Sequence, residues 1–147
     1  MNTEPGATRS AMRTPWHVWV VGIVALLWNA SGAYTIMMAQ AGMLPNLSSD
    51  EVAYYAAQPI WFVGLTDVAL LSAIGAAIAL LSRHRAAVWL FAISLAAILV
   101  TDIYDLAAGS ARMLDGAGAM IVTILIFVIA VLELAYARAM KLRSVLQ

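Results

Sequence analysis

The sequence lacks residues on which many common functions depend. Its 147 residues include no cysteine, which excludes a disulfide framework, a thiolate nucleophile and a cysteine-ligated metal. Only 11% of the residues are charged, whereas a soluble domain carries about 25%, so the chain cannot cover itself with a hydrated surface. The formal net charge is zero, which argues against a nucleic-acid partner.

Motifs for phosphate, acyl and metal chemistry are absent as well. The sequence has no phosphate-binding glycine loop and no Gly-x-Ser-x-Gly element. Its two histidines, His17 and His84, flank apolar segments and have no metal-pair spacing. We therefore expect no metal site and no cofactor.

What the sequence has is long apolar runs. The hydrophobic fraction is 64% and the mean hydropathy is +0.90. Four segments, at about residues 16–39, 60–81, 86–107 and 117–137, reach the roughly 20 residues that a helix needs to cross a bilayer. The sequence therefore predicts an all-α integral membrane protein, most simply four transmembrane helices in an up-down-up-down bundle. This membrane domain covers residues 16–140, between a disordered arm (1–15) and a short tail (141–147).

A short polar helix is expected between the first two spans. Ser48 followed by Glu51 has the spacing of a capping box, and Pro59 stops the helix after about two turns. The segment is too short and too polar to span, so we predict an external interfacial helix.

The basic residues indicate the orientation. Seven of the eight lie on one side of the predicted bundle, and Arg112 lies on the other. The positive-inside rule therefore predicts that both termini are cytoplasmic. A cleaved signal peptide ending at Ala39–Ala41 is the alternative for the first span, but its apolar stretch is longer than the usual signal core.

Several polar residues interrupt the apolar runs. Charged groups in a bilayer normally face the bundle interior and pair, so these residues, with nearby aromatic rings, form the candidate ligand-binding or ion-binding set: Asp67, Asp102, Asp105, Asn29, Glu133, Tyr34, Trp28 and Trp61. For each polar member a structural role is the alternative. Asn29 would hold helices together, Glu133 would be anchored by Arg138, Lys141 or the Arg83–Arg85 loop, and Asp105 would sit at a helix end.

Helical spacing gives each span a small or polar face. Gly22, Ala25, Asn29 and Gly32 form such a stripe on the first span, and we expect it to face other helices. Counting from the 82–85 turn places Asp67 and Asp102 nearly level on neighbouring spans. We predict that they meet and together hold a proton or a cation.

The chain resembles a family of short four-span bacterial membrane proteins, many of which carry the label "sugar transporter". The resemblance rests on PWHVWVVGIVALLWNASGAY (residues 15–34), on LLSRHRAAVWLFAISL (residues 80–95) and on IYDL and AYARAM further along. Its most specific element is W-N-x-x-G at Trp28, Asn29 and Gly32. The chain departs from the family at Thr35, where an acid is frequent, and at Asp105, where asparagine is common. The resemblance implies a bacterial inner (cytoplasmic) membrane protein of the transporter class.

Three function classes stay open at this point. The first is a transporter of a small solute, or a subunit of one, coupled to a proton or cation through the outer-half acids, with Trp28, Tyr34 and Trp61 as stacking surfaces. The second is an accessory subunit of a larger membrane complex, and the third is a membrane enzyme that uses carboxylate acid catalysis on a lipid-soluble substrate. Four spans are few for a carrier, so the expected partners are the lipid bilayer and either further copies of the chain or a larger complex.

Overall fold

The computed structural model describes residues 15–109 and 116–146, and this part of the chain is all-helical. Its helices are α1 (Trp16–Gln40), α2 (Ser49–Ala57), α3 (Ile60–Leu81), α4 (Ala86–Ala108) and α5 (Gly116–Leu142). All but α2 are long and apolar enough to cross a membrane, which confirms the four expected segments. The last helix runs five residues beyond the predicted end, to Leu142. The expected disordered arm (residues 1–15, apart from Pro15) and Arg112 lie outside the described residues.

The helix ends follow from local chemistry. The capping box at the start of α2 is confirmed, because the Ser48 hydroxyl accepts from the Glu51 amide while the Glu51 side chain accepts from the Ser48 amide. The turn after α3 closes with the His84 amide donating to the Ala79 carbonyl at 2.7 Å, which places Arg83 in the left-handed region at φ 57°. This tight turn joins α3 to α4.

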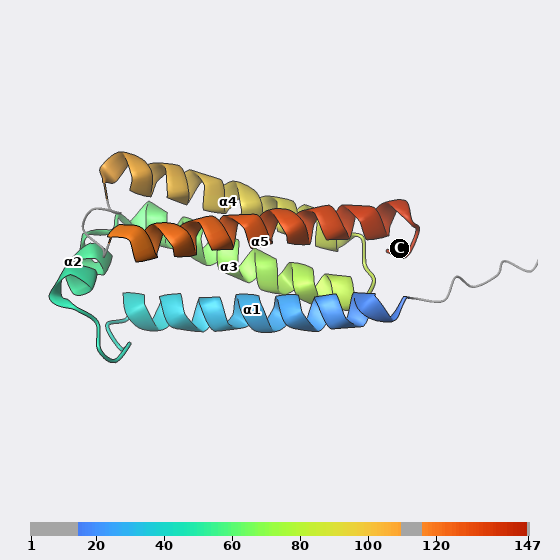
Figure 1. The fold of residues 1–147 in the computed structure, drawn as a ribbon, viewed down its shortest axis with the longest axis horizontal. Helices are drawn as coiled ribbons and strands as arrows, with labels where there is room; N and C mark the ends of the chain where they lie inside the picture. The colour runs from blue at the N-terminus through green and yellow to red at the C-terminus, as the bar shows by residue number, and fades with distance from the viewer. Residues whose placement is uncertain (1–14, 110–115, 147) are drawn as a thin grey trace, which may run out of the picture.

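Helix α3 is the central element of the bundle. It packs along both α1 and α4, and α4 also packs along α5. In Figure 1, α2 lies at one end of the bundle and the turn that joins α3 to α4 lies at the other. At the end farthest from α2, α1 also contacts α5, because His17 Nδ1 and the Tyr136 hydroxyl lie 2.6 Å apart.

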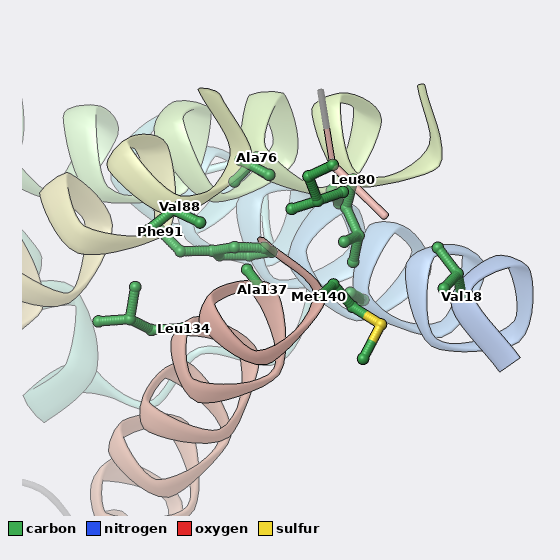
Figure 2. Packing of buried hydrophobic residues seen from close by; sticks show 12 residues of the cluster. Val18, Ala76, Leu80, Val88, Phe91, Leu134, Ala137 and Met140 are labelled. Carbon is green, nitrogen blue, oxygen red and sulfur yellow. The ribbon is translucent and has the colours of Figure 1, made fainter. Parts of the chain in front are cut away.

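The half of the bundle farthest from α2 holds the hydrophobic core. Its core consists of residues from the start of α1 and α4 and the end of α3 and α5, and Figure 2 shows several of these side chains meeting. Ala76, Ala77, Ala87 and Ala137 are each 0% exposed. Alanine at these contacts lets helices approach closely, so these residues form a closed contact among α3, α4 and α5. We call it the alanine seal.

Large apolar side chains cover the outside of the bundle. Leu27, Leu71, Trp89 and Leu132 are each more than 60% exposed. Contiguous exposed apolar surface of this kind is unusual for a soluble monomer, and it is compatible with a membrane protein.

The small stripe of α1 faces the bundle, but its two glycines differ. A Cβ on Gly22 would lie 2.6 Å from Leu81 Cδ2, whereas a Cβ on Gly32 would meet nothing within 4 Å. Gly22 therefore permits a close helix contact of the expected kind. Gly32 does not, because it lies beside open space.

Candidate functional site

The open space beside Gly32 is a cavity of about 430 Å³ in the half of the bundle next to α2. All five helices contribute to its wall. The lining includes, among others, Trp28, Asn29, Gly32 and Thr35 from α1, Tyr54 and Tyr55 from α2, Gln58 from the α2–α3 link, Phe62 and Thr66 from α3, Ser94, Thr101, Asp102 and Asp105 from α4, and Thr123 from α5. Its size falls in the range of about 300–1,000 Å³ that is usual for small-molecule sites.

The cavity carries acids without bases. Asp102 and Asp105 both line it from α4, and no Lys, Arg or His is among the described residues of its wall. The two carboxylates are one helical turn apart, so they face the same space. The electrostatic character of the cavity is therefore negative.

Helix α2 lies over the cavity and is tied to α4. The Tyr54 hydroxyl donates to Asp105 Oδ2 at 2.9 Å. Burial raises the pKa of Tyr54 above its usual value, and the hydrogen bond to Asp105 raises this pKa further. The phenol therefore stays protonated at neutral pH and remains a donor. Burial also raises the pKa of Tyr55, which packs edge-on against Tyr54 with ring centroids 5.2 Å apart.

Two oxygen atoms beside the cavity are buried without a partner. They are Gln58 Oε1 and Thr66 Oγ1, and both residues line the cavity. An unsatisfied buried polar atom costs about 1–3 kcal/mol, so its retention calls for an explanation such as a ligand. Both atoms can accept a hydrogen bond.

A second polar contact joins α1 and α5 deeper in the bundle. Asn29 Nδ2 donates to Glu133 Oε1 at 2.8 Å and to the Ala25 carbonyl at 2.8 Å. The partner of Glu133 is thus Asn29, where the sequence suggested Arg138, Lys141 or the Arg83–Arg85 loop. Glu133 also lines an apolar groove of about 590 Å³ with Val20, Val24, Leu132 and other residues of α1 and α5.

The structure gathers only part of the predicted site. Asp102, Asp105, Asn29 and Trp28 line the cavity, and Glu133 reaches its edge through Asn29.

The remaining candidates lie elsewhere. Tyr34 is 63% exposed, and Trp61 packs edge-on against Tyr104 with ring centroids 4.9 Å apart. Asp67 is half-buried on α3, and its neighbour Thr66 lines the cavity in its place. The pairing of Asp67 with Asp102 stays a prediction. The contact that the structure shows at these acids of α4 is the hydrogen bond from the Tyr54 hydroxyl of α2 to Asp105.

Sequence reasoning missed Tyr54, Tyr55, Gln58 and Thr66. The capping box predicted α2, but no sequence pattern indicated that its tyrosines turn toward the bundle. A comparison with protein-family models, with curated proteins and with solved structures finds no match. The functional assignment therefore rests on the cavity and its chemistry.

Proposed function

We propose that this chain is a carrier for a small solute in the bacterial cytoplasmic membrane and that the cavity is its substrate site. The four long helices cross the bilayer up-down-up-down, with both termini cytoplasmic and α2 on the outer surface. The four long apolar helices and the bias of basic residues to one side support this placement.

The observation that carries the proposal is the division of the bundle into two halves. The half next to α2 holds the cavity, and in the opposite half the alanine seal closes the contact among α3, α4 and α5. A site with tightly packed helices on one side of it is what one state of an alternating-access carrier requires. Such a carrier built from four spans is expected to work as an oligomer.

The acids give the carrier a means of coupling. Asp102 and Asp105 share one wall of an apolar bundle, where two carboxylates close together are costly. A proton or a cation bound between them removes that cost, and its release changes the charge of the site. This property supports coupled transport.

An accessory subunit is the second candidate, and the first half of α5 favours it. Residues 121–126 of α5 are exposed throughout, and they include Ile121 at 65% and Ile124 at 56%. Such a surface would suit another membrane chain as well as lipid. Native extraction separates the two roles, because a carrier is isolated as a homo-oligomer and an accessory subunit with unrelated chains.

Cysteine accessibility tests the carrier directly, since the chain has no native cysteine. Thr101→Cys places a near-isosteric thiol in the cavity wall, and Ala137→Cys places one in the alanine seal. A membrane-impermeant maleimide is applied to right-side-out and to inside-out vesicles. We expect Thr101→Cys to react from both sides, faster from outside, and Ala137→Cys to react slowly from either. Reaction of Thr101→Cys from one side only would reject alternating access.

A further inference from the structure

We propose that the ligand of the cavity is a lipophilic ammonium ion, an amine with an apolar body. The inference rests on the proposed function only in taking the cavity as the substrate site. It is argued from three properties of the wall: its charge, the direction of its hydroxyl groups and its aromatic rings.

The charge of the wall selects a cation. Asp102 and Asp105 contribute carboxylates, and none of the described lining residues is basic. An anionic or zwitterionic ligand would place its own carboxylate or phosphate beside these acids, and the described wall offers no basic side chain to neutralise it. A bare metal ion is disfavoured too, because the described residues contain no group of three His, Cys, Asp or Glu that could hold one.

Three hydroxyl groups of the wall offer acceptors, because their protons are already donated to backbone carbonyls. Ser31 Oγ donates to the Trp28 carbonyl at 2.8 Å, and Thr35 Oγ1 donates to the Ser31 carbonyl at 3.0 Å. Thr101 Oγ1 lies 2.9 Å from the Ile98 carbonyl, to which it donates.

Tyr54 likewise donates to Asp105. The buried oxygens of Gln58 and Thr66 have no hydrogen-bond partner among the described residues, and both can accept a hydrogen bond from a ligand. The Thr66 hydroxyl can also donate one. An ammonium group has three donors and no acceptor, so it matches this wall.

Aromatic rings complete the site. Trp28, Tyr54, Tyr55 and Phe62 all line the cavity. A cation over such a ring face gains from its quadrupole, and the ring edges and apolar wall accommodate the ligand's body. The volume of about 430 Å³ is far more than an inorganic cation occupies.

The side of the cavity is open between α1 and α5. Thr35 and Ser31 of α1 are exposed, as are Val122 at 54% and Ile126 at 39% on α5, and all four residues line the cavity. An amphiphilic amine that partitions into the bilayer can therefore approach the acids between these helices as well as past α2.

Binding of phenethylammonium against phenethyl alcohol tests the inference, because the two probes differ in the cationic group alone. Tryptophan fluorescence of the detergent-solubilised full chain near neutral pH, to which Trp28 in the cavity wall contributes, reports binding. We expect the cation to bind at least about tenfold more tightly than the alcohol, the order of one charge-assisted hydrogen bond. Asp102→Asn should remove most of this preference, and Asp67→Asn, which changes an acid outside the cavity, should retain it. Equal binding of the two probes would overturn the inference, and so would an equal loss in both variants.

Two controls keep the outcomes distinct. Asp105→Asn retains an acceptor for Tyr54, so it serves as a second test if Asp102→Asn does not fold. Excess sodium ions should not displace phenethylammonium, and full displacement by equimolar sodium would assign the acids to an inorganic cation and overturn the inference.

If the cation is preferred but Thr101→Cys reacts from one side only, the ligand class holds and the carrier fails. If labelling occurs from both sides without a preference for the cation, the carrier holds and the ligand class fails.

Discussion

The two glycines of α1 provide a matched pair for testing the packing of the bundle. Gly22→Ala and Gly32→Ala make the same chemical change on one helix, ten residues apart. At Gly22 the new Cβ would lie 2.6 Å from Leu81 Cδ2 and 2.8 Å from Leu81 Cγ, whereas at Gly32 nothing lies within 4 Å. The sequence alone predicted that both glycines face other helices, so only the structure separates them.

The expected difference follows from two opposing free energies. Replacing glycine by alanine inside a helix gains about 0.8–1.0 kcal/mol at either position. At Gly22 this gain is opposed by overpacking, which costs about 1–3 kcal/mol when a neighbour must shift. Because the helix gain cancels in the comparison, Gly22→Ala should be less stable than Gly32→Ala by about 1–3 kcal/mol.

Thermal unfolding in mild detergent measures this difference. Leu81→Ala supplies the control, since it removes the atoms that the new Cβ would meet. The double variant Gly22→Ala/Leu81→Ala should therefore be more stable than the sum of the two single effects predicts. Equal stability of the two alanine variants, or additive effects of Gly22→Ala and Leu81→Ala, would refute the close contact between α1 and α3.

Three further outcomes are expected. Asn29→Ala should lower the stability in detergent by about 1–3 kcal/mol because Glu133 loses its hydrogen-bond donor; no change would mean that the contact is not made. The hydrogen bonds from Ser48 lower the pKa of Glu51. The stabilisation of α2 by the capping box is therefore complete at pH values above the ordinary glutamate pKa of about 4.3, and it is lost as the pH falls through the lowered pKa. The protection factors of the α2 amides against hydrogen exchange should therefore fall at acid pH in the native chain, and Ser48→Ala should abolish this dependence; an identical pH profile of the protection factors in both proteins would contradict it. Reporter fusions after Ser49 and at the C-terminus should give opposite localisations, and equal localisation would reject the four-span arrangement.

The helices themselves were predictable because apolar length and caps are local properties. The bounds of α3 agree with the prediction at both ends, where Pro59 precedes the helix and the turn at Arg83 follows it. Helix α5 was predicted to end at Ala137, yet it continues to Leu142. Polar and basic residues such as Arg138 and Lys141 lower the hydropathy of these last turns, but they do not break a helix.

The candidate site was only partly predictable. The position of a residue along its helix and the direction in which its side chain points depend on different information. Depth follows from counting residues, and it correctly placed Asp102 and Asp105 in the half of the bundle near α2. Direction around the helix axis changes by about 100° per residue, so Thr66 lines the cavity while Asp67 beside it does not. Which direction is inward on α3 depends on where α1 and α4 pack, and that is a tertiary property.

The cavity and the alanine seal correspond to a change in burial along α5. The second half of this helix packs on α4 with Ala130, Leu134, Ala137 and Met140, each at most 8% exposed. Its first half carries Ile121, Val122 and Ile124, which are 54–65% exposed. Helix α5 therefore packs closely over its second half, where alanines permit close approach, and is exposed over residues 121–126, which leaves room near α2. The acids of α4 lie in the half that is left open, where a ligand has space to reach them.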